Sequence, residues 1–219
     1  MNAAIVDHVA ARCRQEGLDL THGLSLEWLD EGIREQIPGS IPDALGLLIG
    51  NTRAIWPFVR RARRARHPVD EHCERVIEDA VVELDARVYY AHRRYGGAYL
   101  PFQRIAHQAG MLHLSPSHLS LHPVHGPWVA LRALVVLEIP APAQPATSAP
   151  DPCTPCDAPC MIALERARDG RDDSDAWRRW LAVRDACPIG RASRYSEPQI
   201  AYHYTKEALW LDVDEGDDR

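Results

Sequence analysis

The sequence predicts an α+β fold in which helices flank one central β-sheet. Three segments have the composition of strands, namely residues 43–51, 86–94 and 128–139. The first and third are nearly continuous apolar runs, typical of strands buried on both faces, and the second is rich in β-branched and aromatic residues. Segments with apolar residues at helical spacing lie between them. This alternation favours a sandwich of helices around a single sheet.

The helical segments in chain order are 3–17, 25–36, 55–65, 67–84, 100–110, 160–168, 174–186 and the beginning of 197–213. Gly17 and Gly110 follow the last periodic residues of their helices, where a left-handed residue often ends a helix. Ser25 is a typical first residue, and Pro38 ends the segment that Ser25 begins. Cys13 and Cys73 lie on apolar helix faces, so we expect them in the core.

Composition narrows the classes of function. The 219 residues are 46% apolar and carry a net charge of −6, which argues against a nucleic acid or a membrane surface as the main partner. The basic run 60–67 is then a solvated helix face. No apolar stretch approaches the roughly 20 residues of a membrane span. The first residues mix acidic and basic side chains where a secretory signal would be apolar, so a cytoplasmic protein with reduced cysteines is expected.

We expect residues 1–139 to form the main core. Residues 140–219 would add a cysteine-containing connector and C-terminal helices that pack on the same core. The segment 140–152 is rich in proline and alanine, which predicts an extended connector, and 214–219 is an acidic tail.

Four cysteines have spacing that suggests metal ligation. Cys153, Cys156 and Cys160 form a C-x2-C-x3-C run, and Cys187 follows 27 residues later, directly before a proline. Four closely spaced thiolates with a Cys-Pro closing the set are what a [4Fe–4S] cluster needs. Zinc accepts the same ligands but is usually held by paired C-x2-C elements. The 3+1 spacing favours iron–sulfur, with another metal or free cysteines on a flexible loop as the alternatives.

The segment "HQAGMLHLSPSHLSLHPVHGPWVALRALVV" (107–136) joins a helix end, a loop rich in turns and histidines, and an apolar strand. Its glycines and prolines indicate a preformed shelf of backbone groups for a wide planar or amide-rich ligand. The histidines lack the spacing of a helical metal site. Arg132 interrupts the strand, and a buried charge costs several kcal/mol unless it is paired. Arg132 should therefore meet an internal carboxylate or an anionic ligand.

The same segment resembles a known family. Its pattern "AGMLHLSPSHLSLHPVHGPWVAL" is similar to the corrinoid-binding segment shared by CblC cobalamin-processing proteins, epoxyqueuosine reductases and reductive dehalogenases. The likeness to CblC extends to "ALGLLIGNTRAIWPFVRRARRARHPVD", "QRIAHQAG" and "WRRWLAVRDACPIGRASRYSEPQIAYHYT". These motifs stand in the family's order and cover roughly residues 40–205.

The resemblance implies a nitroreductase-like α/β sandwich with a central mixed sheet that holds cobalamin in its base-off form. It implies reductive removal of the upper axial ligand, by decyanation with a flavin (FMN or FAD) or by dealkylation with a thiol such as glutathione. A reductase protein is a further candidate reductant, and one [4Fe–4S] cluster would relay the electrons. The enzyme would then be a cyanocobalamin reductase or alkylcobalamin dealkylase, either a monomer or a ligand-dependent homodimer. A corrinoid or metal chaperone without turnover and a flavin-dependent nitroreductase relative are the alternatives.

The resemblance also assigns residues. The expected cobalamin-binding set is His107, Gly110, Ser115, Leu119, Ser120, His122, Pro123, Gly126 and Trp128. Arg132 and Arg184 match the arginines that grip the carboxylates of the thiol, and a guanidinium fork suits that task. Taken alone, His107 is more typical of a core histidine, and Arg184 could equally pair with Asp185 or another neighbour.

Three departures from the family matter. The loop between Gly110 and His122 is shorter than in animal CblC. A third family arginine near the C-terminus has no match, and Lys206 is the nearest cation, which puts glutathione in doubt. The stretch 93–110 has no carboxylate where epoxyqueuosine reductases carry their catalytic acid, which argues against that reaction.

Overall fold

A computed structural model describes residues 2–39, 41–141, 149–170 and 174–213. The central part of the expected connector and the acidic tail lie outside these residues. The main sheet contains the strands β1 (Leu20–Ser25), β2 (Ala44–Asn51), β3 (Ala86–Tyr90) and β8 (Ala130–Pro140). They are arranged in the order β1-β2-β8-β3, so the two strands with the longest apolar runs lie at the centre.

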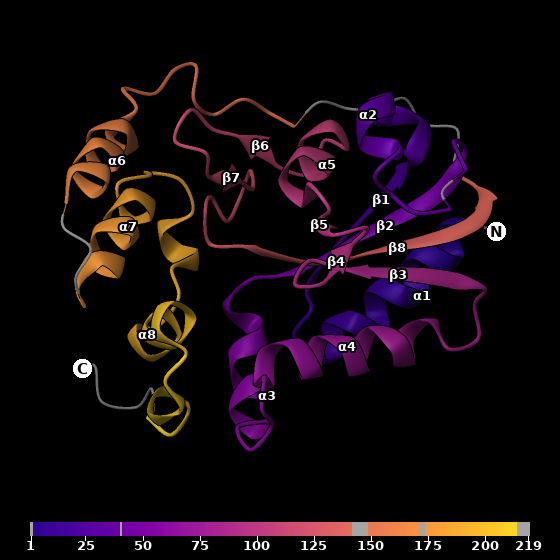
Figure 1. The fold of residues 1–219 in the computed structure, drawn as a ribbon, viewed down its shortest axis with the longest axis horizontal. Coiled ribbons are helices and arrows are strands. Elements are labelled where there is room, and N and C mark those ends of the chain that lie inside the picture. The colour runs from indigo at the N-terminus through magenta and orange to yellow at the C-terminus, as the bar shows by residue number, and fades with distance from the viewer. Residues whose placement is uncertain (1, 40, 142–148, 171–173, 214–219) are drawn as a thin grey trace.

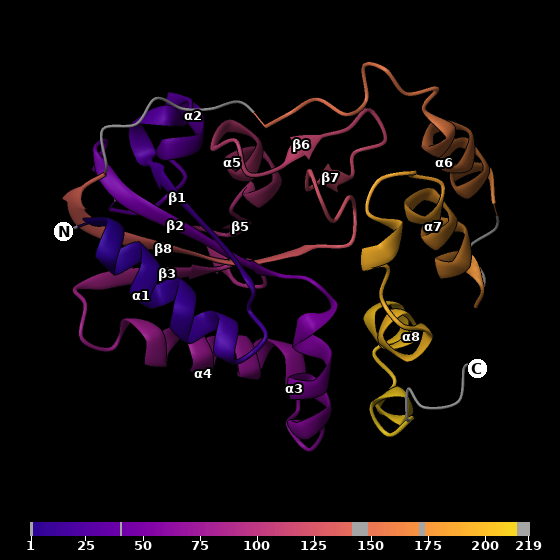
Figure 2. The same ribbon diagram turned by 180° about the vertical axis from the view of Figure 1, so that it is seen from behind.

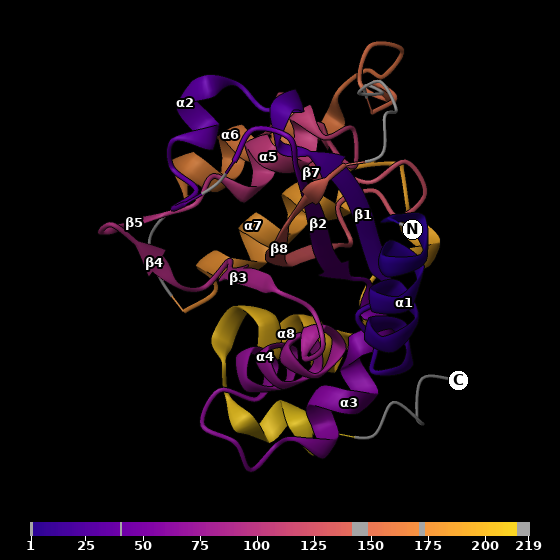
Figure 3. The ribbon, with the colours of Figure 1, turned by 90° about the vertical axis from the view of Figure 1, so that its right-hand side faces the viewer.

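Two layers of helices cover this sheet (Figure 1). The helices are α1 (Asn2–Gln15), α2 (Glu31–Arg34), α3 (Trp56–Arg61), α4 (Pro68–Val81), α5 (Phe102–Gln108), α6 (Pro159–Asp169), α7 (Ala176–Asp185) and α8 (Glu197–Thr205). Short 3-10 turns are η1 (Leu26–Trp28), η2 (Arg53–Ile55), η3 (Arg191–Ser193) and η4 (Ala208–Leu211). Helices α1, α3 and α4 lie on one side of the sheet and α2 and α5 on the other, as the end-on view in Figure 3 also shows.

The alternation of side chains along β2 and β8 builds the two core clusters. Leu45 and Leu47 face the cluster that includes α1 and α4, whereas Leu48 faces the cluster that includes α5. All eight residues of β2 are buried, as the sequence predicted. Cys13 and Cys73 are in the first cluster, which confirms their expected place in the core.

The predicted α+β class is confirmed, but the direction of the strands differs from the expectation. All three pairings in the main sheet are antiparallel, whereas a mixed sheet was expected. A continuous apolar sequence indicates only that both faces of a strand are buried, and it does not indicate the direction of the neighbouring strands. Helices on both sides cover β2 here without any parallel neighbour.

Two elements near the N-terminus also differ. The expected helix 25–36 begins instead as the end of β1, continues through η1 and leaves only α2 as α-helix. Ser25 caps η1 rather than an α-helix, since its hydroxyl accepts a hydrogen bond from the Glu27 amide at 3.3 Å. Strand β1 has a sequence, "LTHGLS", with few β-formers, and it forms because β2 offers a free edge for antiparallel pairing.

The C-terminal helices gather at one end of the sheet (Figure 2). Helix α8 joins the main core through Tyr202, while α6 and α7 pack together through a small cluster that includes Cys160 and Val183. Two short hairpins form separate two-stranded sheets. They are β4–β5 (Arg94–Tyr95, Ala98–Tyr99) and β6–β7 (His113–Leu114, Ser120–Leu121). In the described ranges, no helix has both the length and the apolar character needed to cross a membrane.

Candidate functional site

The four cysteines of the 3+1 pattern line one small cavity. Cys153 and Cys156 lie in the turn before α6, Cys160 lies in the first turn of α6, and Cys187 follows α7. Ala158 adopts a left-handed conformation (φ 49°) that turns the chain into α6. The walls between the thiols are prolines and the β6–β7 hairpin, so the cavity is almost entirely apolar. The fold thus brings together residues that lie up to 34 positions apart in the sequence.

Two of these thiols, those of Cys153 and Cys187, have a raised pKa and so favour the protonated form. Burial raises the pKa of Cys153 to about 11, and Asp151 and the other three thiols add to this effect. Burial also raises the pKa of Cys187. A bound metal would have to displace these protons, since thiolates are the ligating form.

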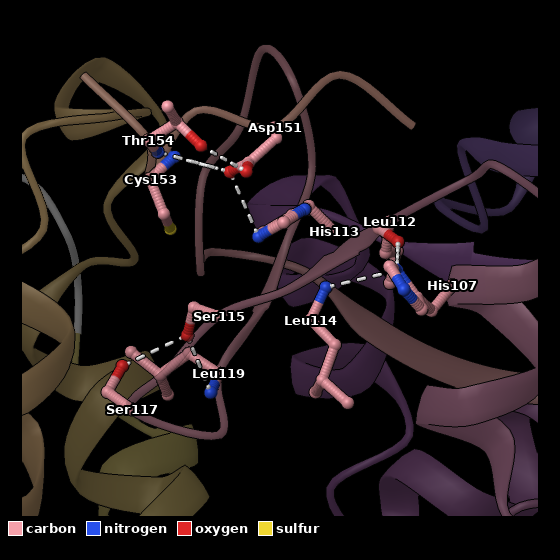
Figure 4. A network of polar contacts seen from close by, with 10 residues as sticks. All are labelled: His107, Leu112, His113, Leu114, Ser115, Ser117, Leu119, Asp151, Cys153 and Thr154. Atoms are coloured by element: carbon pink, nitrogen blue, oxygen red, sulfur yellow. Dashed lines mark hydrogen bonds and ion pairs between the residues drawn. The ribbon is translucent and has the colours of Figure 1, made fainter. Parts of the chain in front are cut away.

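The β6–β7 hairpin is shaped by its own serines (Figure 4). The hydroxyl of Ser115 lies 3.0 Å from that of Ser117 and accepts a hydrogen bond from the Leu119 amide at 3.1 Å. Both serines are buried. His107, on α5, accepts a hydrogen bond from the Leu114 amide at its Nδ1 atom (3.4 Å). Ser115 and His107 therefore hold the expected binding loop in place.

The next turn packs against the cysteine cavity. His122 and Gly126 form a two-way backbone bridge, and burial together with His125 lowers the pKa of His122 to about 4. Gly126 has φ +53°, and a Cβ there would lie 2.1 Å from the carbonyl oxygen of Ile189. Glycine is thus required because two segments of backbone cross. Pro123 lies in the same turn, and Gly110 (φ +78°) follows the end of α5 as predicted.

Replacement of Gly126 by alanine is expected to lower the free energy of unfolding by at least about 1–3 kcal/mol, the cost of a strained non-glycine residue. The added methyl group would also clash with the Ile189 backbone. Gly32→Ala is the matched control, because nothing lies within 4 Å of its added Cβ. Urea unfolding of both variants measures the difference, and equal stability would contradict this account of the crossing.

The two arginines of the expected anion site have different surroundings. The Nε atom of Arg132 donates a hydrogen bond to Asn51 Oδ1 (2.6 Å), so no internal carboxylate neutralises it by a direct contact in the described residues. The guanidinium of Arg184 lies 4.5 Å from the ring centroid of Trp128 and donates a hydrogen bond to the Pro127 carbonyl (2.6 Å). Trp128 is only 1% exposed, so the guanidinium of Arg184 packs against a buried indole ring.

Two neighbouring hollows lie between the sheet and the C-terminal helices. The first, called the apolar hollow, is lined by Ala91, Phe102, Gln103, Leu112, Leu119, Ser120, Pro127, Val129, Leu131, Arg184, His203 and Tyr204. The second, called the cationic hollow, is lined by Ile55, Trp56, Val59, Arg66, His67, Val69, Asp70, Arg132, Tyr195, Gln199, Tyr202, His203 and Lys206. His203 lines both hollows.

Several buried polar atoms at these hollows have no hydrogen-bond partner among the described residues. They are Ser120 Oγ, in the apolar hollow, and Trp56 Nε1 and Tyr195 Oη, in the cationic hollow. A buried polar group without a partner costs about 1–3 kcal/mol. Such groups indicate places where a ligand or water completes the structure.

The cationic hollow favours anions. Burial and Arg132 lower the pKa of Lys206, and burial together with Lys206, Arg184 and Arg132 lowers the pKa of His203 to about 3. Burial is the main reason that His203 stays neutral, and the nearby positive groups add to its effect. Among the described residues, Asp70 is the one carboxylate in the lining.

Of the expected cobalamin-binding residues, Leu119 and Ser120 line the apolar hollow directly. The other expected residues do not line this hollow. Ser115 lines the cavity of the four cysteines, and Pro123 is exposed. Residue-by-residue reasoning did not select His203, Tyr195 and Trp56. The spacing of Gln199, His203 and Lys206 on a helix could have indicated one polar face, but only the fold places that face opposite Arg132.

Comparison with known proteins extends this description. No family model matches the sequence, and no curated protein matches it. Among solved structures, the chain is similar to the crystal structure of the C. elegans B12-trafficking protein CblC, a homologue of human MMACHC. The TM-score is 0.76 at 17% identity, over 95% of this chain and 94% of that one.

Epoxyqueuosine reductases are also similar in structure. The enzyme from Bacillus subtilis gives a TM-score of 0.55 at 13% identity, covering 89% of this chain and 68% of that one. An epoxyqueuosine reductase with a modified tRNA-Tyr stem loop gives 0.57 at 12%, covering 91% and 69%. The fold expected from the sequence resemblance, shared by CblC and the epoxyqueuosine reductases, is therefore the fold of this chain.

Proposed function

We propose that this protein binds cobalamin in the base-off form and removes its upper axial ligand reductively, by decyanation or dealkylation. The observation that carries the proposal is the apolar hollow, walled by the same loop whose sequence resembles a corrinoid-binding segment. The likeness of the whole chain to the B12-trafficking protein CblC supports it.

The apolar hollow suits the broad, largely apolar face of a corrin. Leu119, Val129 and Leu131 provide apolar surface, and its burial contributes roughly 25 cal/mol per Å². The Ser120 hydroxyl, which lacks a partner in the described chain, suits the amide groups at the rim of the corrin. Base-off binding would leave cobalt without its lower nitrogen ligand, and this makes the upper ligand easier to remove.

The cationic hollow would position the reductant. Arg132 and Lys206 suit the carboxylates of a thiol or the phosphate of a flavin, and the unpartnered Tyr195 and Trp56 add hydrogen-bond donors. Because His203 separates this hollow from the apolar one, a reductant held there would adjoin the corrin. Arg184 lines the apolar hollow and would contact the bound molecules from that side of His203.

The four thiols are proposed to hold one [4Fe–4S] cluster that relays electrons. Zinc with four thiolates, at about 2.3 Å each, needs sulfurs about 3.8 Å apart. In the described residues the ligand group that lies within 4.8 Å is a different set, not the four thiols. Their shared cavity, together with the 3+1 spacing in the sequence, favours the corners of a cubane over a single ion.

Anaerobic titration with cob(II)alamin tests the function. We expect the visible absorption band to move to shorter wavelength as the lower base dissociates, with saturation at one equivalent. An unchanged spectrum at micromolar protein would refute cobalamin binding. Turnover is measured separately with cyanocobalamin or an alkylcobalamin and an added reductant, either reduced flavin or a thiol. Release of the upper ligand beyond one equivalent identifies an enzyme, and binding without turnover identifies a corrinoid chaperone instead. A tightly bound yellow flavin with no response to cobalamin would select a nitroreductase relative.

A further inference from the structure

Three potential metal ligands of different chemistry meet beside the cysteine cavity. They are a ring nitrogen of His113 in β6, a carboxylate oxygen of Asp151, and the sulfur of Cys153. These three atoms all lie within 4.8 Å of one another. Figure 4 shows Asp151 between His113 on one side and the Cys153–Thr154 turn on the other. The set combines two parts of the chain that are far apart in sequence.

The spacing fits a four-coordinate divalent ion. The Nε2 atom of His113 lies 3.2 Å from Asp151 Oδ1. With zinc–nitrogen and zinc–oxygen bonds of about 2.0–2.1 Å, two ligands of a tetrahedral zinc ion stand about 3.3 Å apart. The pair can therefore take up an ion with little movement. One nitrogen, one oxygen and one sulfur are all ligand types that zinc accepts.

The carboxylate is held in position by neighbouring groups. Asp151 Oδ1 accepts a hydrogen bond from the Cys153 amide (2.8 Å), and Oδ2 accepts one from the Thr154 hydroxyl (2.6 Å). Outer partners of this kind orient metal ligands and sustain affinity. Oδ1 also accepts a longer hydrogen bond from the Thr154 amide (3.3 Å). An ionised carboxylate has about four lone-pair sites, so one is left for an ion after these three bonds.

The site is also accessible. The His113 side chain is 14% exposed and that of Asp151 is 47% exposed, so one side of the trio faces solvent. Three protein ligands with an open fourth position are typical of zinc sites that bind water or a substrate rather than purely structural ones.

We propose that His113, Asp151 and Cys153 form a second metal site, which takes one zinc-like divalent ion and leaves one coordination position open. Cys153 belongs to both this trio and the four-thiol set. Because one sulfur cannot complete both sites, a single chain holds either the divalent ion or the four-thiol cluster. Binding of the ion therefore competes with assembly of the cluster, a property beyond the proposed processing of cobalamin.

The test uses Co²⁺ alone as the probe, in anaerobic apoprotein that carries Cys156→Ser. This substitution removes one of the four thiols and leaves the trio intact. We expect Co²⁺ to produce a thiolate-to-cobalt charge-transfer band and the intense visible bands of a four-coordinate ion. Adding His113→Ala should weaken binding by more than about 100-fold, because loss of a direct ligand exceeds the 10–100-fold range of an outer-shell partner.

Thr154→Val, which removes only the outer hydrogen bond to Asp151, should weaken binding by about 10-fold. Equal binding with and without His113, or no cobalt spectrum in the Cys156→Ser protein, would overturn the proposal. The first result would assign cobalt to the remaining thiols. The shift of the cob(II)alamin spectrum should be unchanged in protein that keeps Cys156 and carries only His113→Ala or Thr154→Val, so failure of this site is distinguishable from failure of the proposed function.

Discussion

Val129→Trp is expected to weaken cobalamin binding by more than about 100-fold, or roughly 2.7 kcal/mol. Val129 lines the apolar hollow just before β8, and an indole ring there would occupy the space assigned to the corrin. The matched control is Val124→Trp, in the same loop. Val124 is 67% exposed and does not line the hollow, so this variant should titrate like the unsubstituted protein.

Thermal unfolding of both variants shows whether the fold survives, because an oversized side chain can cost about 1–3 kcal/mol by itself. If Val129→Trp fails to fold, Ala91→Trp blocks the same hollow from the turn after β3. Equal cobalamin spectra for the blocked variant and the Val124→Trp control would exclude this hollow as the corrin site.

Cys156→Ser is expected to abolish the iron–sulfur cluster. Anaerobic reconstitution of the unsubstituted protein should give a brown solution with about four irons per chain. Cys156 lines the shared cavity and is one of four ligands, so its loss should leave less than about one iron per chain. Iron analysis and the visible absorption spectrum measure the result.

Cys73→Ala is the control for this experiment. Cys73 is buried in the core on α4, far in the fold from the thiol cavity, and its loss should cost stability without loss of iron. A colourless protein with one zinc per chain, or full iron content in Cys156→Ser, would rule out the cluster.

The sequence predicts the fold well where one physical signal dominates. Strand β2 is recognisable from its nearly continuous apolar sequence, since all of its residues are buried in the fold. Helix α4 is recognisable because its apolar positions repeat at helical spacing. Strand β1 is not recognisable, since its formation depends on the edge of β2 rather than on its own residues. The antiparallel direction of the sheet likewise depends on topology, which no single segment encodes.

The candidate site was partly predictable for a similar reason. Close spacing is enough to group Cys153, Cys156 and Cys160, and the Cys-Pro signal added Cys187, which the fold brings to the same cavity. The trio of His113 and Asp151 with Cys153 joins residues almost 40 positions apart, with no periodicity to reveal it. Similarly, only the tertiary structure places His203 on the wall of both hollows.

The backbone segments that contain Gly126 and Gly190 cross in close contact. A Cβ at Gly190 would lie 2.1 Å from the His125 backbone, just as one at Gly126 would strike Ile189. Pro127 lines the apolar hollow, and Ile189 lines the thiol cavity, so each segment carries one wall. Because the two backbones leave no room for a side chain between them, we expect a shift of the turn after Cys187 to alter the opposite wall as well. The contents of the thiol cavity should then affect the shape of the apolar hollow.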